Sequence, residues 1–149
     1  MKRFAWAGGL LFLALVAAAC GGANASPSPE SGAGPVVQEI VKNADGYTDI
    51  SVNQLAGLMQ NKDFALVNVH VPYEGEIPQT DLFIPFDEIQ NHLDQLPDKG
   101  APIVLYCRSG SMSETAAQAL VKAGYTDVME LDGGFSAWKT AGYELIDKR

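Results

Sequence analysis

A single cysteine, Cys107, lies where a short apolar run meets a loop of small residues. The run is PIVLY at residues 102–106, and the loop continues as RSGSMS at residues 108–113 before an alanine-rich stretch typical of a helix. A cysteine in such a place can ionise and act as a nucleophile, because loop amides and the start of a helix stabilise an anion. The alternative, common for lone cysteines in apolar runs, is a buried and inert side chain.

The loop after Cys107 combines small, polar residues with one cation. Its members are Arg108, Ser109, Gly110, Ser111, Met112 and Ser113. Small residues allow the backbone to curl so that several amide N–H groups face inward, and Ser111 or Ser113 is expected to cap a helix that begins at Glu114. With Arg108 adjacent, these surroundings predict that Cys107 is an ionised nucleophile.

Segments typical of strands and of helices alternate through the rest of the chain. Strands are expected at residues 47–50, 64–69, 102–106 and 127–131, and helices at 51–60, 86–96, 114–124 and 135–140. Ser51 and Gln54 form a capping-box pattern at the first helix. This alternation predicts an α/β fold with a small central parallel sheet flanked by helices on both faces. Cys107 would then lie beyond the carboxyl end of a strand, where such sheets bind ligands.

Two motifs resemble those of the rhodanese domain. YCRSGSMS at residues 106–113 is similar to that family's active loop, C-R-x-G-x-x, and LDGGFSAW at residues 131–138 is similar to its D/E-G-G-x-x-x-W pattern. Residues 50–74 resemble the opening strand, helix and second strand, so the resemblance covers about residues 47–146. Residues 37–149 are therefore identified as a rhodanese-like domain.

The resemblance implies a sulfurtransferase with Cys107 as the catalytic residue. Its thiolate would take sulfane sulfur from thiosulfate or from a persulfide or polysulfide donor, carry it as a persulfide and pass it to a thiol or cyanide acceptor. The loop amides from Arg108 to Ser113 would hold the persulfide charge, and no metal or organic cofactor is implied. The alternative is a rhodanese-fold module of low turnover that serves in sulfur relay, binding or redox sensing.

Ser113 distinguishes the chain from the related cysteine phosphatases and arsenate reductases. Those enzymes resemble rhodaneses but carry an arginine six positions after the nucleophile, which clamps a tetrahedral oxyanion with two parallel hydrogen bonds. In this chain the sixth position is Ser113. A phosphatase activity is therefore disfavoured.

Several positions depart from the family pattern. Asn68-Val69-His70 stands where many members carry Asp-x-Arg, so an ion pair is expected to be replaced by a neutral hydrogen bond between Asn68 and His70, or by one that protonation of His70 can switch. Met112 stands where arginine or threonine is frequent and either fills an apolar gap or lowers the positive charge of the loop. Asp132 is expected to approach the loop from a neighbouring strand end.

The turn after the second expected strand carries extra carboxylates. They are Glu74, Glu76 and Asp81, and they form either a solvated loop or a negatively charged surround for the site. With fewer cations at the loop, a persulfide or polysulfide is expected to be a better donor than dianionic thiosulfate. The histidines and carboxylates near this turn match no common metal-ligand spacing, so no metal site is predicted.

Residues 1–19 predict a lipoprotein-type signal peptide. Lys2 and Arg3 precede an apolar run, and LVAAAC, which ends at Cys20, resembles a bacterial lipobox in which the cysteine is acylated. Residues 20–36 are then the lipid-attachment cysteine and a flexible Gly/Ala/Ser/Pro tether. An uncleaved N-terminal anchor, or a soluble exported protein cut before Cys20, are the alternatives.

The charge limits the partners that the chain can have. The formal net charge is −8, and loss of Lys2 and Arg3 with the leader makes it about −10. Such a domain is expected to repel nucleic acid and to gain nothing from anionic lipid headgroups, so contact with a membrane is expected through the lipid alone. The expected location is the cell envelope, anchored to a membrane outside the cytoplasm. Acylation of Cys20 would leave Cys107 unpaired in an oxidising compartment, where a thiol is either buried or used.

Overall fold

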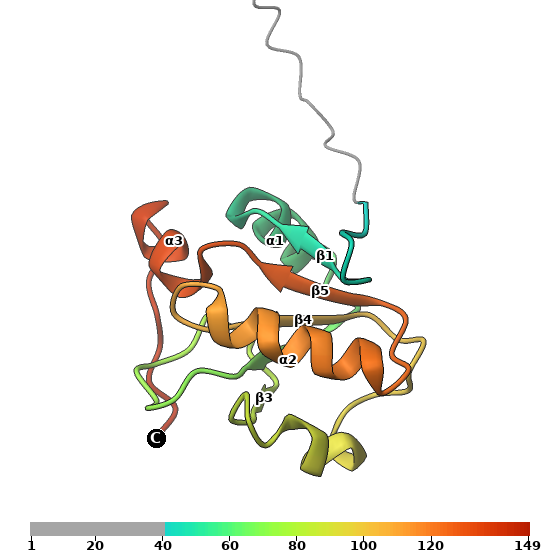
Figure 1. Ribbon diagram of the computed structural model, residues 1–149. Helices are drawn as coiled ribbons and strands as arrows, with labels where there is room; N and C mark the ends of the chain where they lie inside the picture. Colours follow the sequence, from blue (N-terminus) through green and yellow to red (C-terminus); the bar gives the residue numbers. More distant parts are fainter. Residues whose placement is uncertain (1–40) are drawn as a thin grey trace, which may run out of the picture. The chain divides into compact units, whose positions relative to one another are not determined.

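Five parallel strands form the centre of the computed structural model, which describes residues 41–149 (Figure 1). The strands are β1 (Thr48–Ile50), β2 (Ala65–Asn68), β3 (Leu82–Phe83), β4 (Ile103–Tyr106) and β5 (Val128–Leu131). They lie in the order β1-β5-β4-β2-β3, and every neighbouring pair is parallel. The expected signal peptide, Cys20 and the tether lie outside the described residues.

Helices cover both faces of this sheet, which confirms the predicted fold class. They are α1 (Val52–Leu58), η1 (Met59–Asn61), η2 (Ile89–Gln95), α2 (Ser111–Lys122) and α3 (Gly134–Thr140). One hydrophobic cluster joins the sheet to α2 and η2, and a second joins it to α1 and α3. Among residues 41–149, no helix combines the length and the apolar character needed to cross a membrane.

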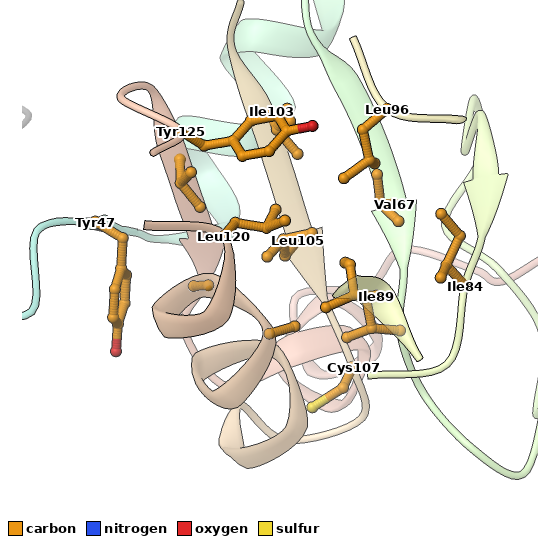
Figure 2. Close-up of a cluster of buried hydrophobic side chains, with 14 residues drawn as sticks. Tyr47, Val67, Ile84, Ile89, Leu96, Ile103, Leu105, Cys107, Leu120 and Tyr125 are labelled. Carbon is orange, nitrogen blue, oxygen red and sulfur yellow. The ribbon is translucent and has the colours of Figure 1, made fainter. Parts of the chain in front are cut away.

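β4 lies between β5 and β2 and is buried on both faces. Leu105 belongs to the cluster on the α2 side (Figure 2), whereas Val104 and Tyr106 belong to the cluster on the α1 and α3 side. All four residues of β4 are buried, as expected for a central parallel strand that reads as an unbroken apolar run. The hydroxyl group of Tyr106 remains satisfied because it lies 2.7 Å from Thr80 Oγ1 and accepts the N–H of Ile77 at 3.1 Å.

Local sequence signals explain α1 but not η2. The predicted capping box is confirmed, since Ser51 Oγ accepts the N–H of Gln54 and Gln54 Oε1 accepts the N–H of Ser51. The helix expected at residues 86–96 is instead a 3₁₀ segment, kinked at His92 where φ is −124°. The expectation of a regular helix was wrong, because Pro85 and Pro97 bound a segment only three turns long and its bonds, such as Asn91 N–H to Glu88 C=O, span three residues.

β3 has no signal of its own in the sequence. It comprises two residues, Leu82 and Phe83, and pairs with β2 at one edge of the sheet. The passage around it is rich in turn residues, which is why a loop was expected there. Its position is determined by backbone hydrogen bonds to residues distant in the sequence, such as that from the N–H of Ile84 to the C=O of Asn68.

The turn from β5 into α3 packs directly on the loop that carries Cys107. The N–H of Phe135 donates to Cys107 C=O at 2.9 Å, and the N–H of Ser136 donates to Arg108 C=O at 3.0 Å. Gly134 adopts φ +54°, and a Cβ built on it would lie 2.3 Å from the Cys107 carbonyl oxygen. Only glycine permits this approach, so the Gly-Gly motif serves to hold the cysteine loop.

Replacing Gly134 with alanine is expected to destabilise the fold by about 2–4 kcal/mol, because the methyl group collides with backbone atoms at a positive φ. Urea-induced unfolding measures this change. Gly142→Ala is the matched control: Gly142 has φ +91°, but among the described residues nothing lies within 4 Å of the added Cβ, so a loss of about 1 kcal/mol is expected. Equal losses in the two variants would show that close contact is not the cause.

Candidate active site

Cys107 follows β4 directly and lies at the end of the cluster beyond Leu105 (Figure 2). Its side chain is 2% exposed. Its Sγ accepts the N–H of Gly110 at 3.1 Å and lies 3.4 Å from the hydroxyl of Ser113. The sulfur therefore has apolar side chains on one side and the Gly110 N–H and the Ser113 hydroxyl within hydrogen-bond reach on the other.

α2 begins one turn earlier than the sequence indicated. Gly110 is its N-cap residue with φ +110°, no side chain caps it, and the N–H of Glu114 donates to Gly110 C=O at 2.8 Å. The expected serine cap at Ser111 or Ser113 was wrong. Ser113 lies inside the first turn, where its hydroxyl lies 2.8 Å from Gly110 C=O and 3.4 Å from the sulfur, so it caps no backbone N–H group.

Arg108 pairs with a carboxylate and is largely exposed. Its guanidinium donates to Glu74 Oε1 at 3.2 Å, and the side chain is 57% exposed. His70 Nε2 lies 3.2 Å from the same Glu74 oxygen. The His70 contact and then the Arg108 charge lower the pKa of Glu74. The cation expected to assist Cys107 is thus partnered by a carboxylate of the neighbouring turn.

Asn68 and His70 lie together at the end of β2. Asn68 Oδ1 accepts the backbone N–H of His70 at 3.0 Å, and its Nδ2 donates to Gly75 C=O at 3.1 Å. The buried imidazole of His70 packs edge-on against Phe135, with ring centroids 5.2 Å apart. Asn68 therefore holds the turn that carries Glu74 and Glu76 through hydrogen bonds from its uncharged amide to backbone groups. The imidazole of His70 points to Glu74.

The other loop residues point in different directions. Ser109, Ser111 and Asp132 are exposed, and the N–H of Asp132 donates to Ile50 C=O. Met112 is partly buried against the cluster on the α2 side, as a gap-filling residue would be. Phe135 and Trp138 are core residues of the opposite cluster. Within residues 41–149, no three His, Cys, Asp or Glu side chains are grouped so as to hold a metal ion.

The acidic turn is part of the folded structure and not a solvated loop. Asp81 pairs with Lys62 at 2.5 Å and accepts the N–H of Leu66 at 2.8 Å. Glu76 is buried and lies 3.2 Å from Lys148 Nζ. Asp81 and Glu76 thus form contacts that hold this turn to other segments of the chain. Glu74 is the one of the three carboxylates that binds Arg108.

Glu130 is the residue of this site that the sequence did not reveal. It lies in β5, opposite Leu105 of β4 and Asp49 of β1, so its side chain points to the face that α2 covers. It is 2% exposed, and Ser113 Oγ lies 2.5 Å from Glu130 Oε1. The only available signal was a carboxylate inside the apolar run VMEL, which is unusual for a strand buried on both faces.

Burial raises the pKa of Glu130 from 4.5 to about 7. The hydrogen bond from Ser113 opposes this shift, whereas the negative charges of Glu114, Asp49 and Asp132 reinforce it. A carboxyl group that changes charge near neutral pH therefore lies one hydroxyl away from the sulfur.

Residues 51–141 match the model of the family described as the rhodanese-like domain. The chain belongs to the rhodanese-like domain family. A protein named thiosulfate sulfurtransferase GlpE from Pseudoalteromonas translucida is 30% identical over 109 residues, which cover 68% of this chain and 98% of the relative. A protein named sulfurtransferase from Allochromatium vinosum is 35% identical over 92 residues, covering 60% of this chain and 84% of the relative.

A solved structure shares this rhodanese-like fold. A rhodanese-like domain protein from Staphylococcus aureus is 27% identical, with a TM-score of 0.57, and the match covers 66% of this chain and 98% of that one. The family includes proteins named as sulfurtransferases, which agrees with the expected class of activity. The individual roles of the loop residues, Asn68, His70 and Asp132 stay predictions.

Glu130 makes a specific prediction for stability. Since folding raises its pKa from 4.5 to about 7, its favourable contribution is complete below about pH 4.5 and is lost as the pH rises through 7. Relative to Glu130→Gln, the wild type is expected to lose about 3 kcal/mol of unfolding free energy between pH 4.5 and pH 8. Urea unfolding of both proteins across this range tests the prediction.

Glu114→Gln is the control for this experiment, because it removes an exposed carboxyl group next to the same loop. Glu114→Gln should keep most of the pH dependence of the wild type. If Glu114→Gln reduces the pH dependence as much as Glu130→Gln does, then general charge, and not burial of Glu130, is responsible.

Proposed function

We propose that the chain is a sulfurtransferase that carries sulfane sulfur as a persulfide on Cys107. With thiosulfate, the thiolate would attack the outer sulfur, the donor S–S bond would break, and sulfite would leave with the bonding electron pair. An acceptor thiolate or cyanide would then attack the terminal sulfur of the persulfide, and Cys107 would leave as a thiolate. Neither step requires an added oxidant or reductant.

The surroundings of the Cys107 sulfur carry this proposal. The Gly110 N–H and the Ser113 hydroxyl lie within hydrogen-bond reach of Sγ, and the thiolate and the persulfide are both anions that such donors stabilise. The two backbone bonds from α3 hold the Cys107 and Arg108 carbonyl groups, so the loop keeps its shape without substrate. Such preorganisation favours charge that develops on the sulfur during transfer.

The charges near the loop support a persulfide or polysulfide as the preferred donor. Glu114 in α2 and Asp132 after β5 add negative charge near the buried carboxyl group of Glu130. Arg108, the cation of the loop, is already paired with Glu74. Thiosulfate concentrates two negative charges on a compact ion, which these carboxyl groups repel. The buried Glu130 disfavours a phosphate dianion for the same reason.

Intact-protein mass spectrometry tests the transfer step. Cys20→Ser leaves Cys107 as the only cysteine of the sequence, and this variant is incubated separately with thiosulfate and with cysteine persulfide. We expect a gain of one sulfur atom that cyanide removes, with loading by the persulfide about tenfold faster or more.

The control is the variant that also carries Cys107→Ser, which should gain no sulfur. No adduct with either donor would refute the sulfurtransferase and favour the low-turnover binding or redox-sensing module. Equal loading rates would refute only the proposed donor preference.

We also propose that this domain is held in the cell envelope by a lipid on Cys20. The support is the N-terminal sequence, in which a basic start, an apolar run and LVAAAC precede a Gly/Ala/Ser/Pro segment. The acidic character of the chain offers anionic headgroups no attraction, so the lipid would supply the membrane affinity.

Inhibition of lipoprotein signal peptidase in an expressing bacterium is expected to leave the unprocessed, larger form in the membrane fraction. Cys20→Ser should likewise prevent processing and acylation, whereas Cys107→Ser is the control that should be processed normally. Normal processing in the presence of the inhibitor would exclude the lipid anchor.

A further inference from the structure

Ser113 holds a hydroxyl hydrogen for which several acceptors compete. Its Oγ lies 2.5 Å from Glu130 Oε1, 2.8 Å from Gly110 C=O and 3.4 Å from Cys107 Sγ. A serine hydroxyl has one hydrogen to donate and can accept hydrogen bonds through its lone pairs. The sulfur and the carboxyl group therefore cannot both receive the Ser113 hydrogen at the same time.

The protonation state of Glu130 decides which acceptor receives the hydrogen. An ionised Glu130 is the strongest and nearest acceptor, so it takes the hydroxyl hydrogen and leaves Ser113 able only to accept from a neutral Cys107 thiol. A protonated Glu130 instead donates its own hydrogen to Ser113 Oγ. The only other acceptor named for the Ser113 hydroxyl is then the neutral Gly110 C=O, and an anionic sulfur is the stronger acceptor, so the hydroxyl can donate to it.

We propose that Glu130 is a positioning residue for Cys107, which turns the Ser113 hydroxyl toward the sulfur when it is protonated and withdraws it when it is ionised. The proposal deepens the sulfurtransferase function and rests on it for its biological meaning. A neutral Glu130 allows the Ser113 hydroxyl to stabilise the anionic sulfur, as thiolate or persulfide. A charged Glu130 removes this stabilisation. Only O–H and S–H bonds change, and the released proton passes to water.

Burial makes this coupling strong. Glu130 and Cys107 are each 2% exposed, so water screens little of the interaction between two anions joined through one hydroxyl. Because bulk water does not reach the carboxylate, the hydrogen bond from Ser113 cannot be replaced by one from solvent and is therefore strongly favoured. The charge of Glu130 is therefore felt at the sulfur through the Ser113 hydroxyl.

The charged groups that face Glu130 place the change near neutral pH. Asp49 of β1, Glu114 of α2 and Asp132 after β5 are all acidic and raise the pKa of Glu130, together with its burial, to about 7. The nearest cation of the loop, Arg108, is bound to Glu74. Below pH 7 the hydroxyl therefore supports the sulfur anion, and above pH 7 that support is lost.

Alkylation of Cys107 by iodoacetamide tests the proposal without any sulfur donor. The thiolate displaces iodide, and the rate is followed by mass spectrometry in the Cys20→Ser protein from pH 5.5 to pH 8.5. Glutamine cannot ionise and can still donate its amide N–H to Ser113 Oγ. The ratio of the Glu130→Gln rate to the wild-type rate is therefore expected to be near 1 at pH 5.5 and to rise to about tenfold at pH 8.

Ser113→Ala separates the role of the hydroxyl from that of charge alone. In this background, Glu130→Gln is expected to raise the rate at pH 8 by no more than about threefold, since only through-space repulsion remains. Glu114→Gln is the control for loss of one nearby charge: because that charge helps to raise the pKa of Glu130, this variant should keep the pH-dependent change in rate and move it to lower pH.

Three results would overturn the proposal. They are a Glu130→Gln rate that is unchanged or lower at pH 8, a ratio that does not vary with pH, and an undiminished tenfold gain in the Ser113→Ala background. Because alkylation needs no donor or acceptor, these results are independent of whether sulfur transfer occurs. A failure to load sulfur with normal alkylation behaviour would instead refute the proposed function alone.

Discussion

The close approach of the start of α3 to the loop after β4 is the constraint on which the rest of the site depends. Gly134 lets the backbone of α3 approach the Cys107 carbonyl, and the N–H groups of Phe135 and Ser136 bind the carbonyl oxygens of Cys107 and Arg108. Once these carbonyl groups are held, the loop can present the Gly110 N–H to the sulfur. A parallel sheet supplies this arrangement because the ends of β4 and β5 meet at one edge.

The charge around the sulfur differs from what a cationic loop would suggest. Arg108 is turned outward to Glu74, which His70 also contacts, and the interior of the site contains the carboxyl group of Glu130. Stabilisation of an anionic sulfur therefore depends on short-range donors, and hardly on net positive charge. Such donors act over one hydrogen bond and are sensitive to where each hydrogen points, which is why the protonation of Glu130 has so large an influence.

Local patterns predicted the elements whose own residues determine them. The unbroken apolar run at residues 102–106 predicted the central strand, and Ser51 with Gln54 predicted the cap of α1. Prediction failed where contacts distant in the chain decide the outcome. β3 exists because it pairs with β2. Ser113 does not cap α2, because its hydroxyl lies 2.5 Å from the carboxyl group of Glu130, seventeen residues further along the chain.

The sequence by itself determined the family, the fold class and the position of the cysteine. Apolar periodicity, a capping box and a cysteine directly after an apolar run are local properties of the chain, and they agree with one another on the fold. Only the tertiary structure decided which charges reach that cysteine. Arg108 could have faced the sulfur, and Glu130 could have been an edge residue, because the partner of a long side chain depends on elements that fold against it. The physical reason is that hydrogen bonds and charge interactions act between neighbours in space, and the order of residues along the chain does not specify those neighbours.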